Sequence, residues 1–285
     1  MNSHDEAPRA LGILAGGGRL PLQVANAAKA AGRAVFVVGL EGFVDRAWLA
    51  DWPHDILRMG AAGRILSALR AHACKDLVLI GPVRRPSFFD MRPDAEGARI
   101  AARIGRAAFG GDDGLLAAVI KVLGEEGFRV LGAHDILQEA LGPRGLLTRT
   151  APDATAMSDI ARGIAVARAL GAADVGQGCV VQEGVVLAVE ATEGTDAMLA
   201  RCGPLKRESP GGVLIKIVKP GQERRADLPT LGPDTVAAAA EAGLRGIAFE
   251  AGGAILVDRA ATIAAADTAG LFLLGLDPDE IHPRS

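Results

Sequence analysis

The sequence predicts an α/β protein of two domains, an N-terminal Rossmann-like parallel-sheet domain and a mixed α/β C-terminal domain. The 285 residues exceed the usual length of a single domain. In the first half, short apolar runs alternate with helical patterns, which is typical of right-handed βαβ units. In the second half, several strands follow one another before helices return, which favours a mixed sheet.

The elements of the first half follow from apolar spacing. Continuous short apolar runs predict buried strands, and apolar residues on one side of a helical pattern predict helices that cover the sheet. The expected strands are 11–15, 35–38, 77–80 and 128–131, and the expected helices are 21–31, 61–73, 95–109 and 115–125.

The breaker cluster Gly142-Pro143-Arg144-Gly145 marks the expected domain boundary. The domains are therefore expected at 1–143, binding a nucleotide or sugar nucleotide, and at 144–285, carrying the catalytic groups. Beyond the boundary, helices are expected at 158–170, 233–242 and 260–266, and strands at 179–181, 185–189, 213–218, 247–249, 255–257 and 271–274.

Composition and charge exclude several classes of function. Hydrophobic residues make up 49% of the chain, which is enough for packed cores. The net charge of -3 and the absence of Tyr argue against nucleic-acid binding, since neither a basic field nor stacking platforms are available. The three cysteines lie far apart and form no CxxC pair, which fits a reducing cytoplasm. Neither a signal peptide nor an apolar run of membrane-spanning length is recognised, so a cytoplasmic location is expected.

A glycine-rich turn follows the first expected strand. Gly16, Gly17 and Gly18 stand between this strand and a helix, where backbone amides and the helix dipole can bind a phosphate. Pro21 occupies the position where the dinucleotide fingerprint requires its third glycine, while Glu41 lies near the place of the ribose-binding acid. The pattern favours a nucleotide or sugar-nucleotide site over an NAD site. A tight turn without a ligand is the alternative.

Two further motifs of the first half are candidate substrate-binding groups. Asp112 and Asp113 stand at a helix start, where one carboxylate can cap the helix and the second can serve a metal ion, a sugar hydroxyl or a lysine. His134 follows a strand end, where open α/β sheets bind ligands, although a single histidine is more often structural.

The second half has the densest cluster of charged residues. Glu190, Glu193 and Asp196 fall within seven residues at a strand end, and Lys216 and Lys219 lie downstream on opposite faces of an extended segment. Carboxylates hold a hard divalent ion, and the ion with Lys or Arg neutralises a transferring phosphoryl group. The pattern fits hydrolysis of a phosphoanhydride, and a solvated charged loop is the alternative. The chain contains no GxxxxGK[ST], GxSxG or HExxH motif, which leaves P-loop, serine-hydrolase and zincin chemistry without support.

At these motifs the sequence resembles the LpxI-type UDP-2,3-diacylglucosamine pyrophosphatases of lipid A biosynthesis. The matching segments occur in the family's order over roughly residues 10 to 275, and they read ILAGGGRLP, GGDDGLL, GAHDIL, VLAVEATEGTDAML, VLIKIVKPGQERRADLPTLGPDTV and GIAFEAG. The resemblance implies a magnesium-dependent cut of UDP-2,3-diacylglucosamine into UMP and 2,3-diacylglucosamine 1-phosphate (lipid X). It implies attack of water on the sugar-side phosphorus. A homodimer and a lipid substrate are also implied, and with them peripheral contact with the inner membrane.

The resemblance also assigns roles to residues. Asp227 is expected as the first catalytic and metal-binding carboxylate, and Asp196 as a second carboxylate with both roles. Glu193 is expected as a further catalytic residue. The expected substrate-binding residues are Thr195, Lys216, Lys219, Gln222 and Arg225. Glu223 departs from the family pattern, which often has Asp at this place, so it is not assigned as a ligand.

Two alternatives belong to other classes of protein. One is a nicotinamide-dependent oxidoreductase built on the first domain, against which Pro21 argues. The other is a non-catalytic UDP-sugar-binding protein, which would bind the substrate without consuming it.

Overall fold

The computed structural model describes residues 9–83, 92–105, 112–137, 139–208 and 210–281. Its backbone contacts divide the chain into two compact units. Unit 1 contains the chain up to Gln138 and, in addition, the later segment Glu223–Asp227. Unit 2 contains Glu139–Gln222 and the chain from Leu228 onward. Both units are α/β, which confirms the predicted fold class.

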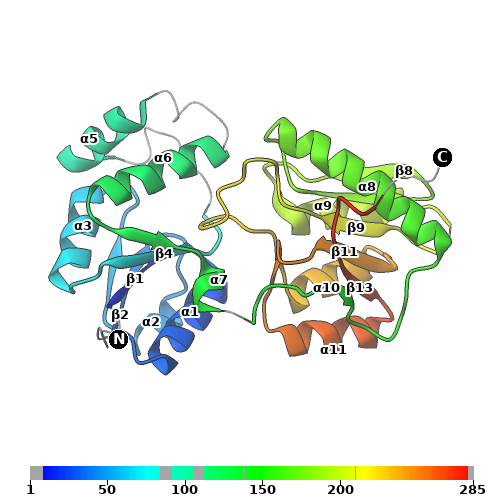
Figure 1. Cartoon of the computed structure of the whole chain (residues 1–285), viewed down its shortest axis with the longest axis horizontal. Coiled ribbons are helices and arrows are strands. Elements are labelled where there is room, and N and C mark those ends of the chain that lie inside the picture. The colour runs from blue at the N-terminus through cyan, green and yellow to red at the C-terminus, as the bar shows by residue number, and fades with distance from the viewer. Residues whose placement is uncertain (1–8, 84–91, 106–111, 138, 209, 282–285) are drawn as a thin grey trace, which may run out of the picture. The chain divides into compact units, whose positions relative to one another are not determined.

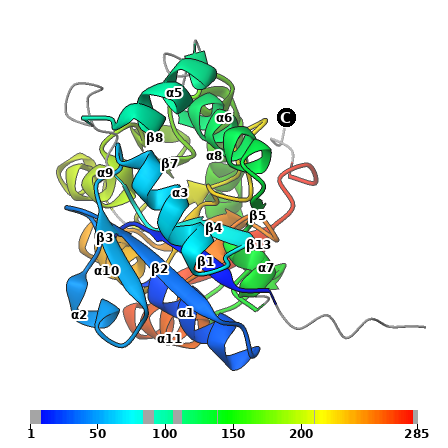
Figure 2. The ribbon, with the colours of Figure 1, turned by 90° about the vertical axis from the view of Figure 1, so that its left-hand side faces the viewer.

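Unit 1 is a parallel five-stranded sheet in the order β3-β2-β1-β4-β5. Figure 2 shows these strands side by side, and Figure 1 shows α1 and α7 on one face with α3, α5 and α6 on the other. The elements are β1 (Leu11–Ala15), α1 (Leu20–Ala30), β2 (Val35–Leu40), α2 (Arg46–Leu49), β3 (His54–Leu57), α3 (Ala62–Ala71), β4 (Asp76–Ile80), α5 (Ala95–Ile104), α6 (Asp112–Glu125), β5 (Arg129–Leu131) and α7 (Ala133–Ile136). This is the Rossmann order 3-2-1-4-5 without a sixth strand, with its switch point between β1 and β4.

Unit 2 is a mixed six-stranded sheet in the order β6-β13-β11-β9-β7-β8. Strands β9, β11 and β13 are parallel, whereas β7 pairs antiparallel with both β9 and β8. The elements are β6 (Gly145–Leu146), α8 (Ala154–Ala172), β7 (Gly178–Gln182), β8 (Val185–Val189), α9 (Gly194–Cys202), the 3-10 turn η2 (Gly203–Leu205), β9 (Val213–Lys216), β10 (Thr230–Leu231), α10 (Pro233–Glu241), β11 (Gly246–Glu250), β12 (Ile255–Leu256), α11 (Arg259–Ala269) and β13 (Phe272–Leu276).

Side chains that point alternately to the two faces of the unit-2 sheet form two hydrophobic cores, one on each face. On β9, Leu214 joins α9, α10 and α11 in one core, while the neighbouring Ile215 joins α8 in the other. Since successive side chains of a strand point to opposite faces, a sheet covered on both sides needs apolar residues at nearly every position. The run Val213-Leu214-Ile215 meets that requirement, with every residue fully buried.

The expected elements are largely present, although the short elements α2, α7, β6 and β10 were not expected. Strand β3 was not expected, because two of its four residues, His54 and Asp55, are polar and suit an edge position. The expected strand 213–218 ends at Lys216. The segment after Glu193, expected as a loop, forms the helix α9, which begins at Gly194. The expected helix 95–109 is described as far as Ile104, and residues 106–111 lie outside the described part of the chain.

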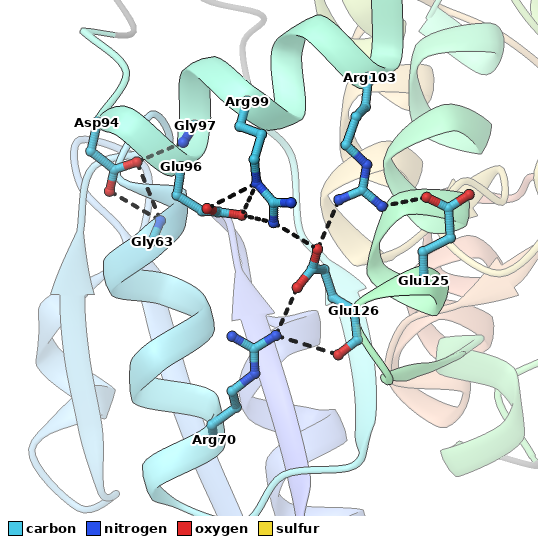
Figure 3. A network of polar contacts seen from close by, with 9 residues as sticks. All are labelled: Gly63, Arg70, Asp94, Glu96, Gly97, Arg99, Arg103, Glu125 and Glu126. Atoms are coloured by element: carbon cyan, nitrogen blue, oxygen red, sulfur yellow. Dashed lines mark hydrogen bonds and ion pairs between the residues drawn. The ribbon is translucent and has the colours of Figure 1, made fainter.

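An acidic residue joins two helices of unit 1 at their starts. Asp94 is the N-cap of α5 and accepts a hydrogen bond from Gly97 N at 2.7 Å. The same carboxylate accepts from Gly63 N of α3 at 3.0 Å (Figure 3). One N-cap side chain therefore satisfies amides of both helices, which orients α5 on α3.

A set of ion pairs also connects α3 and α5 to the end of α6. Glu126, directly after α6, bonds Arg70 of α3 at 2.8 Å, Arg99 of α5 at 3.1 Å and Arg103 of α5 at 2.7 Å (Figure 3). Hydrogen bonds from Arg103 and Arg70 hold the pKa of Glu126 below its usual range. Three helices thus share one carboxylate, whose contribution depends on ionic strength because the arginines are solvent-exposed.

The start of β4 holds a buried carboxylate. Asp76 is 1% exposed and accepts hydrogen bonds from Arg129 at 2.8 Å and from Arg33 at 2.5 Å. Burial alone would raise the pKa of Asp76, but the hydrogen bonds and charges of Arg129 and Arg33 outweigh it and hold the pKa below its usual range.

Asp76→Asn is expected to lower the free energy of unfolding at pH 7 by about 1.5–3 kcal/mol, the usual value of hydrogen bonds to a charged group. Because the pKa is lower in the folded protein, the carboxylate stabilises the fold above the unfolded-state pKa and loses this effect as pH falls through the folded pKa. The difference between wild type and variant should therefore shrink in acid. Urea unfolding at several pH values measures it, with the exposed Asp51→Asn as a control, and a difference independent of pH would contradict the assignment.

Candidate functional site

The carboxyl edge of the unit-2 sheet collects charged side chains. Strands β8, β9 and β11 all run in one direction, and the residues at or just after their ends are Glu190, Lys216 and Glu250. Glu250 accepts a hydrogen bond from Val218 N at 3.0 Å, which fixes the chain as it leaves β9. Open α/β sheets bind ligands at this edge, so the position is consistent with a functional site.

Two of these side chains, Glu190 and Lys216, form a polar triad with the half-buried Thr195. The Thr195 hydroxyl donates to Glu190 Oε1 at 2.6 Å and accepts from Lys216 Nζ at 2.5 Å. Lys216 Nζ also lies 3.4 Å from Glu190 Oε1. Glu190 is 6% exposed and Lys216 3%, so the pair has left water. The structure thus brings together two predicted residues, Thr195 and Lys216, through a third that was not assigned.

A glycine on the strand between them allows the acid and the lysine to meet. Gly178 of β7 pairs with Lys216 of β9, and its carbonyl accepts from Glu190 N at 2.9 Å. A Cβ atom at Gly178 would lie 2.8 Å from Glu190 Oε2 and 3.5 Å from Lys216 Cγ. Glu190, just after β8, and Lys216 of β9 can therefore contact each other across the intervening strand β7, because Gly178 has no side chain between them.

The expected acidic loop is the start of helix α9. Thr195 and Asp196 lie in its first turn, and Glu193 is the residue that precedes it. Hydrogen bonds from its own amide and from Arg201, 2.6 Å away, hold the pKa of Glu193 below its usual range. Asp196 is exposed in the first turn, where a negative charge interacts favourably with the helix dipole.

Lys219 and Gln222 shape a turn. Gln222 N donates to Lys219 O at 3.1 Å, with Pro220 and Gly221 between them and Gly221 at φ +78, the features of a type II turn. Gln222 Oε1 accepts from Lys219 N at 2.8 Å, and its amide nitrogen donates to Gln177 at 2.9 Å. Lys219 Nζ donates to Asp174 at 2.7 Å. The two lysines take different partners, as the strand alternation predicts.

The segment Glu223–Asp227 belongs to unit 1. Its carbonyl at Glu223 accepts from Asp227 N at 3.0 Å, Ala226 packs against the unit-1 core, and Asp227 is half-buried. Arg225 makes a bidentate pair with Glu223 at 2.8 and 2.6 Å, which holds the pKa of Glu223 below its usual range. Asp227 thus lies in unit 1 and Asp196 in unit 2, and their joint binding of one metal ion stays a prediction.

The glycine-rich turn of unit 1 packs against the loop after β4. Gly16 N donates to Ile80 O at 2.9 Å and Gly17 N to Pro82 O at 3.0 Å. A Cβ atom at Gly16 would lie 2.5 Å from Gly81 O. Two of the three expected phosphate-binding amides are therefore engaged by backbone carbonyls. A phosphate at this switch point would instead meet Gly18, at φ +75, and the amino terminus of α1.

His134 lies on α7 at the carboxyl end of β5, in contact with α1 and β4 through its helix. Its ring covers Gly132, where a Cβ atom would lie 2.2 Å from the ring. Its Nδ1 atom is buried and has no hydrogen-bond partner among the described residues. A buried imidazole nitrogen without a partner favours a polar ligand at this edge. Asp112 and Asp113 begin α6, and their side chains lie outside the described part of the chain.

Comparison with known proteins identifies the family. The family models described as the LpxI N-terminal domain and the LpxI C-terminal domain match residues 10–140 and 143–274. A curated protein of Caulobacter vibrioides, named UDP-2,3-diacylglucosamine pyrophosphatase LpxI, is 47% identical over 278 residues, covering 95% of this chain and 99% of that protein. The chain belongs to the LpxI family. Within this LpxI-family chain, no helix of the described residues is both long and apolar enough to cross a membrane.

The structure adds several residues to the expected set. Glu190 completes the triad, and Glu250 bonds the backbone just after β9. Gln177 and Asp174 accept hydrogen bonds from Gln222 and Lys219, the two ends of the turn before Asp227. No group of three or more His, Cys, Asp or Glu suited to a metal ion occurs among the described residues of this LpxI-family protein.

Gly16→Ala is expected to lower the free energy of unfolding by roughly 1–3 kcal/mol, because the added Cβ atom overlaps a backbone carbonyl that cannot rotate away. Gly124→Ala is the matched control in unit 1. It lies in helix α6 with open space around its Cβ position, and it should stabilise by about 0.5–1 kcal/mol. Urea unfolding of both variants gives the comparison, and shifts of the same sign would contradict the close contact at the switch point.

Proposed function

We propose that this protein hydrolyses the pyrophosphate bond of UDP-2,3-diacylglucosamine, giving UMP and 2,3-diacylglucosamine 1-phosphate (lipid X), in lipid A biosynthesis. The observation that carries the proposal is the 47% identity, over 95% of the chain, to a protein named for this activity. The family models also support it, because one matches residues 10–140 and the other residues 143–274, so the similarity covers both halves of the chain.

In the proposed reaction, a water oxygen attacks the phosphorus on the sugar side. The new P–O bond forms as the bond from this phosphorus to the bridging oxygen breaks, and the bridging oxygen leaves with UMP. The attacking water loses its protons to solvent or to a nearby base. Negative charge accumulates on the phosphoryl oxygens and on the leaving phosphate, so cationic groups and backbone amides supply the stabilisation.

We assign Asp227 as the catalytic carboxylate. It follows a segment whose shape is fixed by the Lys219–Gln222 turn and by the Glu223–Arg225 pair. Lys216 and Thr195 serve as substrate ligands at the sheet edge of unit 2, with Glu193 and Asp196 beside them. Arg225 is half-exposed and already paired, so it would contact the substrate through the remainder of its guanidinium group.

We further propose that the reaction depends on Mg²⁺. Magnesium is usually bound through one or two carboxylates together with water and substrate phosphates. The half-buried Asp227 and the exposed Asp196 are carboxylates that fit this chemistry. When bound, the ion would neutralise charge on the diphosphate. We also propose a cytoplasmic location and, because the proposed substrate carries two acyl chains, peripheral contact with the inner membrane. A homodimeric state is proposed from the family resemblance alone.

Incubation with UDP-diacylglucosamine and Mg²⁺ in oxygen-18 water tests the function. Mass spectrometry should find UMP without the label and diacylglucosamine 1-phosphate carrying one labelled oxygen. Excess chelator should abolish turnover, and added Mg²⁺ should restore it. Label in UMP would contradict attack at the sugar-side phosphorus. Tight binding of the substrate without any product would instead favour a non-catalytic UDP-sugar-binding protein.

Asp227→Ala is expected to abolish UMP release while leaving the fold intact, because the side chain is only half-buried. A loss of about 100-fold or more in kcat is the size expected for a group that acts on the reacting atoms. Kinetics and circular dichroism of Asp227→Ala should be compared with Asp234→Ala, which alters an aspartate in the first turn of α10. Near-normal turnover of Asp227→Ala would refute the assignment.

A further inference from the structure

The triad at the edge of the unit-2 sheet contains a charge arrangement that stability alone does not explain. Glu190 and Lys216 are both more than nine-tenths buried, and removing two charges from water has a large desolvation cost. Replacing such a pair with apolar side chains of similar volume is often neutral or stabilising. A buried pair at a sheet edge therefore favours a role beyond folding.

The hydrogen bonds of the triad are unevenly distributed. Glu190 Oε1 accepts from Thr195 and faces Lys216 Nζ, whereas Glu190 Oε2 is buried without a partner among the described residues. A carboxylate that served only to fill the core would leave no oxygen unsatisfied, since this costs free energy. All the described side-chain bonding of Glu190 is directed toward the two residues that we assign to the substrate.

The bonding also fixes the direction of each group. The Thr195 hydroxyl hydrogen is committed to Glu190, so its oxygen can accept from Lys216. Lys216 is thereby connected to the first turn of α9, where helix amides meet the carboxyl edge of the sheet. Rotation of Thr195 or of Lys216 would break two contacts, and a side chain at Gly178 would come within 2.8 Å of Glu190 Oε2.

We propose that Glu190 is a positioning residue for the reaction: it orients Lys216, through Thr195, toward the diphosphate of the substrate. The inference rests on the proposed function for the identity of that substrate. Glu190 does not touch the substrate. It supplies the countercharge that allows a buried lysine at this edge, and it fixes the start of α9 relative to β9.

Four variants test the proposal in the full-length protein. Glu190→Gln keeps the shape and removes the charge, Thr195→Val keeps the shape and removes the hydroxyl, and Thr195→Ser keeps the hydroxyl. Glu241→Gln, an exposed acid at the end of α10, is the matched control. Each is measured for kcat and KM of UMP release, for equilibrium binding of UDP and for its urea midpoint.

Glu190→Gln and Thr195→Val should each lower kcat/KM by about 10- to 100-fold, less than the roughly 100- to 1,000-fold cost of removing a donor to the reacting group. Both should weaken UDP binding, and Thr195→Ser should recover most of the kcat/KM lost in Thr195→Val, while the control Glu241→Gln should stay within about threefold of wild type. The decisive measurement is a cycle with Lys216→Met. If Glu190 acts through Lys216, Glu190→Gln should have no further effect on UDP affinity in the Lys216→Met background.

Two outcomes would overturn the inference: a folded Glu190→Gln protein with kcat/KM and UDP affinity near those of wild type, or an equal cost of Glu190→Gln with and without Lys216. If Glu190→Gln does not fold, Glu190→Asp, which keeps the charge and shortens the side chain by one methylene, is taken through the same cycle with Lys216→Met and decides the same question. A wild type that binds UDP but releases no UMP would refute the proposed function, and the binding cycle would still decide the role of Glu190.

Discussion

The burial of a lysine at the edge of the unit-2 sheet is the constraint on which the architecture of the site depends. Lys216 is 3% exposed, and a charge removed from water must be paired and hydrogen-bonded. Its partners come from two other elements, Glu190 after β8 and Thr195 on α9. The intervening strand β7 must then carry glycine at Gly178 so that they can meet. The pairing of the Lys216 ammonium group thus involves the order of three strands, the position of the start of α9 and a glycine at position 178.

The two units treat a buried carboxylate in opposite ways. Asp76 of unit 1 is shared by Arg33 and Arg129, so positive charge exceeds negative charge locally and the pKa is lowered. The side chain of Glu190 in unit 2 contacts one lysine and one hydroxyl, and its Oε2 atom has no partner in the part of the chain that the structure describes. Full pairing is what a structural ion pair requires, and incomplete pairing is more typical of groups maintained for function.

The sequence predicted the class of fold because strand and helix patterns are local. Leu11–Ala15 followed by glycines and a helix indicates a βα unit whatever its neighbours are. Contacts across the sheet are not local. The partnership of Glu190 and Lys216 depends on the strand order β9-β7-β8, which apolar spacing does not contain. Helix α9 was missed because Gly194, at φ +81, is typical of a turn, and no side chain caps the helix start.

The short segment before Asp227 illustrates how a reactive carboxylate can be held without a regular element. Ordering a loop residue costs about 1–2 kcal/mol of backbone entropy, and a loop ordered only when substrate binds would subtract that cost from affinity. Here Pro220 restricts φ, Gly221 supplies the positive φ of the turn, and Gln222 bonds the amide of Lys219. Glu223 and Arg225 then close on each other, and Ala226 packs on the unit-1 core. With the residues that precede it fixed in this way, and its own amide bonded to the carbonyl of Glu223, the backbone of Asp227 is positioned by contacts of the chain itself, which is the condition for catalysis by a positioned carboxylate.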